Sequence, residues 1–257
     1  MRALVLCLAL ANCSGENAAP VPQPASGPSY RVMFIGNSLT YFNDLPATVA
    51  QLALSAGQTV EVSSVARPNF ALIDHVSGKS NAVEVIQTGG WDYVILQQGP
   101  SSLDLSRDTL VLATRLLDSY IKAARGRSAL LMVWPESTRF EFFDDVRASY
   151  QLAAQEVQGL FLPAGEAWLG AWAEDSQLQL YGPDGYHPSE LGTYLTALVV
   201  FEGITGRDAE TLPAEATVAG QRLSVSPGRV RLLQRAAHAA VAQFSAVSSS
   251  ADHPGRP

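Results

Sequence analysis

The stretch that decides the fold stands at the start of the folded part of the chain. It reads Tyr30-Arg31-Val32-Met33-Phe34-Ile35-Gly36-Asn37-Ser38-Leu39-Thr40. The apolar run up to Ile35 predicts a buried strand, and the glycine after it ends the strand. Ser38 would then lie just past the carboxyl end of a first strand, where open α/β sheets bind their ligands. An ordinary strand-to-helix turn is the alternative, because Gly, Asn and Ser are common turn residues.

Strand and helix patterns alternate along the rest of the chain. Further strand patterns cover residues 59–65, 92–97, 129–134 and 159–163. Helix patterns cover residues 45–56, 70–76, 82–87, 107–124, 144–158, 189–201 and 229–244. Such alternation implies parallel strands joined by crossover helices. We therefore predict one α/β domain over residues 30–245, a three-layer α/β/α arrangement around a mostly parallel five-stranded sheet.

The N-terminus has the pattern of an export signal. Met1-Arg2 precedes a short apolar core that ends at Ala11, too short for a membrane span, which needs about 20 apolar residues. We predict a signal peptide over 1–13, a flexible linker over 14–29 and a disordered tail over 246–257. Cleavage near Ala11 would release a secreted protein. Alternatively, Leu10-Ala11-Asn12-Cys13 resembles a bacterial lipobox, and a lipid on Cys13 would attach a periplasmic or envelope protein to the membrane.

The composition limits the classes of function. With 47% hydrophobic and 16% charged residues, the chain can bury a sizeable core. A net charge of -7 argues against nucleic acid as a partner, because phosphate binding needs clustered Lys and Arg. Cys7 and Cys13 are the only cysteines, so the mature domain is expected to have no internal disulfide.

A nucleophilic serine needs an imidazole to take its proton and a carboxylate to orient that imidazole. The chain has four histidines. His253 falls in the predicted tail, and His238 falls among alanines in the last helix, where a structural role is expected. His75 follows the second strand and either lines the site or is structural. The remaining candidate for the base is His187.

His187 lies in a short loop rich in glycine and proline. The loop reads Tyr181-Gly182-Pro183-Asp184-Gly185-Tyr186-His187-Pro188-Ser189. Asp184 precedes His187 by three residues, so one tight loop can place a carboxylate beside an imidazole. The alternative is a simple turn whose last residue, Ser189, caps the next helix.

Together, Gly36-Asn37-Ser38-Leu39 and Asp184-Gly185-Tyr186-His187 resemble two blocks of the SGNH hydrolases, also called the GDSL lipase/esterase family. The resemblance implies a flavodoxin-like SGNH hydrolase fold. It also implies Ser38 as nucleophile, His187 as general base and then acid, and Asp184 as the group that orients His187.

Two further blocks of that family differ in this chain. Where the family has a glycine that donates its N–H to the oxyanion, this chain has Asn69, whose backbone N–H is the expected substitute. Where the family has an asparagine side chain, this chain has Gln97 and Gln98, so either amide, or the N–H of Gly99, is the expected donor. The backbone N–H of Ser38 is a further donor.

These observations predict a serine esterase that needs no metal or organic cofactor. The expected substrate is a small-molecule or glycan ester with a small acyl group, such as an acetyl group on a glycan. The alternative is a non-catalytic or weakly catalytic protein that binds a glycan or another envelope component on the same fold. The sequence does not define the oligomeric state.

Overall fold

The computed structural model describes residues 29–250, and for residues 246–250 it describes only the backbone. The predicted signal peptide, nearly all of the predicted linker, Cys13 and residues 251–257 therefore lie outside the described residues. Among the described residues, no helix is both long enough and apolar enough to cross a bilayer.

The core of the molecule is a parallel sheet. Its strands are β1 (Ser29–Gly36), β2 (Thr59–Ala66), β3 (Tyr93–Leu96), β4 (Arg127–Leu131) and β5 (Leu160–Leu162). They pair in the order β2-β1-β3-β4-β5, all parallel, which confirms the predicted five-stranded sheet. A separate two-stranded hairpin is formed by β6 (Thr217–Val218) and β7 (Gln221–Arg222).

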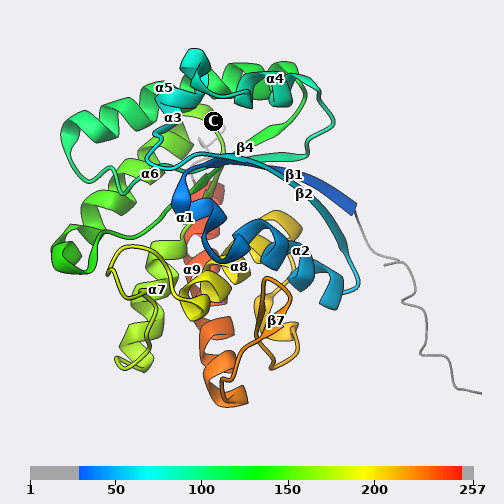
Figure 1. The fold of residues 1–257 in the computed structure, drawn as a ribbon, viewed down its shortest axis with the longest axis vertical. Coiled ribbons are helices and arrows are strands. Elements are labelled where there is room, and N and C mark those ends of the chain that lie inside the picture. Colours follow the sequence, from blue (N-terminus) through cyan, green and yellow to red (C-terminus); the bar gives the residue numbers. More distant parts are fainter. Residues whose placement is uncertain (1–28, 251–257) are drawn as a thin grey trace, which may run out of the picture.

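Helices cover both faces of the sheet, as Figure 1 shows. One face carries α3 (Leu72–Asp74), α4 (Ala82–Gln87), α5 (Asp104–Ala123) and α6 (Phe143–Val157). The other carries α2 (Leu45–Ser55), α8 (Glu190–Thr205) and α9 (Pro227–Ser250), with α7 (Ala164–Glu174) packed on α8 and α9. The predicted three-layer α/β/α architecture is confirmed.

The central elements are apolar on every side, as their sequences require. β1 is buried from Val32 to its end, because it lies between two strands and two helical layers. Nearly all of α8 is buried as well, since α2, α7 and α9 surround it on the side away from the sheet. Largely apolar segments of this kind belong in the interior of a domain.

The structure differs from the sequence prediction at several elements, among them the β6–β7 hairpin, which was not predicted. β4 ends at Leu131, although the apolar pattern runs to residue 134, because only Met132 still pairs, its N–H donating to Leu162 O at 3.0 Å. α7 was not predicted; it starts after Pro163 and has no side-chain cap to announce it. α9 continues to Ser250, past the expected domain boundary at residue 245.

The strand order also places β1 at a switch point. β2 lies on one side of β1 and β3 on the other, so the crossovers leave β1 in opposite directions. In sheets of this order, ligands bind beyond the carboxyl end of the strand at the switch point. That is the end of β1 at which Ser38 lies.

Candidate active site

Ser38 is the first residue of the short helix α1 (Ser38–Tyr41), which follows β1 directly. Asn37 caps this helix, its Oδ1 accepting the N–H of Leu39 at 3.1 Å, and Ser38 is half-buried. Gly36 makes the tight turn feasible, because a Cβ there would lie 2.3 Å from Thr40 Oγ1. The turn predicted around Ser38 is therefore a closely packed feature in which the glycine is required.

Gln97, at the end of β3, holds this turn from the neighbouring strand. Its Oε1 accepts the N–H of Asn37 at 3.1 Å and the hydroxyl of Thr40 at 2.7 Å. Its Nε2 donates to Asn37 Oδ1 at 3.0 Å and to Gln98 O. The side chain is buried and its hydrogen-bonding groups are all used within the fold.

His75 supports the same turn through a hydrogen bond to the backbone of Gly36. Its Nε2 lies 2.9 Å from the carbonyl oxygen of Gly36, which can only accept, so Nε2 carries the proton. Nδ1 then accepts from Ser80 Oγ at 2.8 Å. The ring is fully buried, and this desolvation lowers the pKa of His75. Of the two roles considered for His75, the structure shows the structural one.

Asp184 and His187 form a closely bonded pair. Asp184 Oδ2 lies 2.6 Å from His187 Nδ1, and its Oδ1 accepts the backbone N–H groups of Tyr186 and His187 at 3.0 and 2.9 Å. These bonds, with the one to the His187 ring as the largest cause, lower the pKa of Asp184 to about 2. The carboxylate is therefore charged at neutral pH and fixes the orientation of the imidazole.

The loop that carries this pair is tied to itself and to the end of β4. Gly182 N–H donates to His187 O at 2.7 Å, and Tyr181 and Pro188 form an antiparallel bridge. Trp134 is buried and its Nε1 donates to Tyr186 O at 3.0 Å. Gly185 has a left-handed φ of +67°, and a Cβ there would meet Ser137 Oγ at 2.4 Å. The loop therefore has little room to change its shape.

Phe42 and Asn43, which follow α1 directly, connect the Ser38 turn to the His187 loop. The ring of Phe42 stacks on the ring of His187, with the two centroids 4.5 Å apart. Asn43 Nδ2 donates to Pro188 O and Thr193 Oγ1, both at 3.0 Å. The structure thus brings the turn after β1 and the loop before α8 together, although they are far apart in sequence.

His187 Nε2 has no hydrogen-bond partner among the described residues, although the atom is buried. An unpaired buried ring nitrogen is costly, so it requires an explanation. No hydrogen bond joins Ser38 Oγ to it in this structure. Serine and histidine side chains of hydrolases often tighten into contact only when substrate is present.

The residues expected to stabilise an oxyanion have different surroundings. Asn69 is exposed and adopts a left-handed φ of 60°, the conformation that normally favours glycine. Gln98 is buried, with Nε2 donating to Ser101 Oγ and Ser106 O and Oε1 accepting from Leu72 N. Like Gln97, it uses both of its amide protons within the fold. The structure thus uses both glutamine side chains as supports for neighbouring loops.

A hollow of about 340 Å³ flanks the His187 loop. Phe42, Tyr181, Pro183, Pro188 and Glu190 are among its lining residues, whereas Ser38 and His187 are not. The depression therefore adjoins the loop that carries Asp184 and His187, and Phe42, which follows α1.

Comparison with known proteins defines the class of fold. No protein-family model matches the sequence, and no curated protein matches it either. Among solved structures, a DUF4886 family protein from Bacteroides uniformis superposes with a TM-score of 0.71 at 19% identity, over 83% of this chain and 95% of that one.

Hydrolases of known fold are also among the similar structures. A putative SGNH hydrolase from Slackia heliotrinireducens has a TM-score of 0.59 at 25% identity, over 68% of this chain and 99% of that one. A lipase/acylhydrolase from Enterococcus faecalis has a TM-score of 0.57 at 15% identity, over 69% of this chain and 96% of that one. The chain has the SGNH hydrolase fold, which confirms the resemblance seen in the sequence.

Proposed function

We propose that the protein is a serine esterase that hydrolyses carboxylic esters. The observation that carries this proposal is the state of His187: its Nδ1 is held by the Asp184 carboxylate, and its buried Nε2 lacks a partner. An imidazole arranged in this way can accept a proton at Nε2. Ser38 lies four positions before Phe42, the residue that stacks on His187. The hydroxyl of Thr40 is nearer to Phe42, but it is buried and donates to Gln97 Oε1.

In the proposed reaction, Ser38 Oγ attacks the acyl carbonyl carbon while its proton moves to His187 Nε2. The charge on the carbonyl oxygen is stabilised by backbone N–H groups, those of Ser38 and Asn69. His187 then gives its proton to the departing alcohol, which leaves an acyl group on Ser38. A water molecule, deprotonated by His187, attacks this ester and releases the acid and Ser38.

The surroundings of the His187 loop support a substrate class. The depression beside this loop, lined in part by Phe42 and Tyr181, can accept a bulky alcohol half such as a glycan. It offers little enclosed apolar surface for a long acyl chain. We therefore propose small acyl groups, with acetylated glycans as the leading class of substrate.

Hydrolysis of p-nitrophenyl acetate by the purified protein tests this proposal. We expect Ser38→Ala to lower kcat by at least about 10³-fold, since the nucleophile of a catalytic triad acts as part of a unit. Ser119→Ala, on the exposed face of α5, is the matched control and should retain the rate. Equal rates for Ser38→Ala and the unchanged protein would overturn the proposal.

A second candidate is a protein that binds an acylated glycan without efficient catalysis. It is favoured by the internal bonding of Gln97 and Gln98, which leaves no side-chain amide of this pair for an oxyanion. Loss of one such donor typically costs about 10²–10³ in rate. Binding of acetylated glycans with no Ser38-dependent turnover would favour this second candidate.

A further inference from the structure

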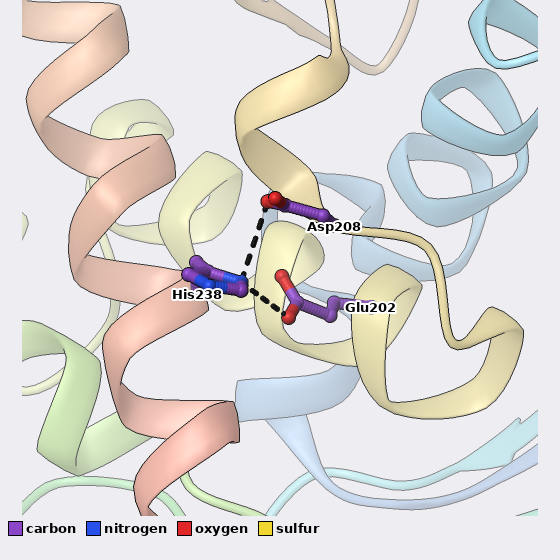
Figure 2. A group of neighbouring side chains, drawn as sticks. All are labelled: Glu202, Asp208 and His238. Carbon is purple, nitrogen blue, oxygen red and sulfur yellow. Dashed lines mark hydrogen bonds and ion pairs between the residues drawn. The ribbon is translucent and has the colours of Figure 1, made fainter.

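A cluster of three ionisable side chains lies away from the candidate active site. Glu202 is near the end of α8, Asp208 caps the short helix η4 (Ala209–Thr211), and His238 is on α9. Figure 2 shows the two carboxylates and the imidazole pointing towards one another. Glu202 is 13 positions after Ser189, or about 20 Å along a helix, so the cluster is separate from the His187 loop.

The ligand atoms of these side chains are close enough to share one ion. His238 Nδ1 lies 2.8 Å from Glu202 Oε1 and 3.3 Å from Asp208 Oδ1. One ligand atom from each residue lies within 4.8 Å of the others. Zinc binds imidazole nitrogen and carboxylate oxygen at about 2.0–2.2 Å, so a single ion can reach three atoms spaced in this way.

The backbone holds both carboxylates in place. Gly206 ends α8 with a left-handed φ of +68°, and the chain then reverses so that Asp208 faces Glu202. Glu202 Oε2 accepts the N–H of Ala209 at 2.9 Å, and Asp208 Oδ1 accepts that of Glu210 at 2.7 Å. Outer bonds of this kind orient the ligands of metal sites.

The cluster contains more negative than positive groups, since two carboxylates share one imidazole. The side chain of Glu202 is only 8% exposed, and burial of a carboxylate requires a compensating positive charge. Within the part of the chain that the structure describes, His238 is the only cationic partner of Glu202 and Asp208. Two carboxylates therefore face one imidazole, and a divalent cation held by all three side chains would balance both negative charges.

We propose that Glu202, Asp208 and His238 bind a divalent transition-metal ion of the zinc class. A nitrogen ligand favours zinc over calcium or magnesium, which prefer oxygen ligands alone. The ion would join α8, η4 and α9, and so tie the C-terminal helix to the centre of the domain. Its role is structural, because it lies far from the candidate active site.

The test uses the purified protein after removal of metal with a chelator. Calorimetric titration with zinc sulphate should show one ion bound per chain, and zinc should raise the midpoint of thermal unfolding by about 5 °C. We expect His238→Gln to weaken zinc binding by at least 10-fold, since loss of an outer partner alone costs about 10–100-fold. Glu202→Gln, which keeps the size of the buried side chain, should have the same effect.

Two controls identify where zinc binds. His187→Gln removes the imidazole of the Asp184 pair, and His253→Gln removes an imidazole outside the described residues. In both variants zinc should still raise the midpoint of thermal unfolding. Circular dichroism of the metal-free His238→Gln protein must show that it is folded. The proposal is overturned if zinc does not bind, which would leave the cluster as an ion pair, or if binding is lost with His187→Gln instead.

Discussion

At the scale of single residues, two side chains three positions apart carry most of the chemistry proposed for this protein. The spacing of Asp184 and His187 predicted their pairing, because both belong to one tight loop and need no distant element to meet. The contacts of the two glutamines after β3, by contrast, could not be predicted from their spacing. The side-chain amide of Gln97 or Gln98 was expected to donate to an oxyanion. Gln97 bonds instead to Asn37 and Thr40, on a turn whose position depends on the packing of the whole sheet.

Asp184→Asn tests the proposed orienting role. Since the pKa of Asp184 is lowered to about 2, its charge and its bond to His187 persist from neutral pH down to that region. The asparagine amide would face Nδ1 with a proton, which favours the wrong tautomer of the imidazole. We expect kcat for p-nitrophenyl acetate to fall by about 10³–10⁴-fold with little change in thermal stability. Asp108→Asn on α5 is the control, and a similar loss there would contradict the assignment.

At the scale of elements, the strands and long helices could be predicted because their apolar patterns match their burial. β1 is a continuous apolar run and is buried on both faces, and α5 carries one apolar stripe. α7 could not be predicted in this way. It lacks a capping side chain, and Gly165 near its start is required because a Cβ there would lie 2.5 Å from Val133 O, a contact that only the folded chain reveals.

The turn between β1 and α1 is held in place by hydrogen bonds from Gln97. Gln97→Leu tests how much these bonds contribute to the stability of the fold. The substitution leaves the buried N–H of Asn37 and the hydroxyl of Thr40 without their acceptor. Each buried group left unsatisfied costs about 1–3 kcal/mol. We expect the free energy of unfolding, measured with urea, to fall by about 2–4 kcal/mol. Gln155→Leu on the exposed side of α6 should change it by less than about 0.5 kcal/mol; an equal effect of both would refute the proposed support.

At the scale of the whole molecule, α8 connects the two functional regions. It begins at the cap Ser189, beside the His187 loop, and ends near Glu202 in the proposed metal cluster. Because α8 is buried nearly throughout, both regions rest on the core of the domain. This arrangement was predictable only in part, since the sequence indicates the helix but not that Asp208 and His238 meet its far end.

The stability of the folded molecule should depend on pH through His75. Burial lowers the pKa of His75 below its ordinary value of 6.5, so the folded state keeps the ring neutral while the unfolded state takes up a proton. The stabilisation that comes from keeping His75 neutral is therefore fully present above pH 6.5. It is lost as the pH falls towards the lowered pKa, by up to about 1.4 kcal/mol per pH unit.

Urea unfolding at pH 7.5, 6.5 and 5.5 measures this dependence. His75→Gln keeps a donor near the Gly36 carbonyl and has no titrating ring, so it should show a flatter loss of stability below pH 6.5. Comparing the two proteins cancels the contributions of other groups, among them His238. Identical slopes would show that His75 does not contribute to the pH dependence.

The loop from Tyr181 to Pro188 is closed by its own backbone bonds, with Asp184 and His187 inside it. Any shift of this loop must therefore carry carboxylate and imidazole together and leave the distance between them unchanged. The part that carries Ser38 is joined to this loop by Phe42, whose ring stacks on His187, and by Asn43, which donates to Pro188 O. In the proposed reaction a substrate would therefore meet a carboxylate and an imidazole that are already assembled, and only the contact between Ser38 Oγ and His187 Nε2 would remain to be made.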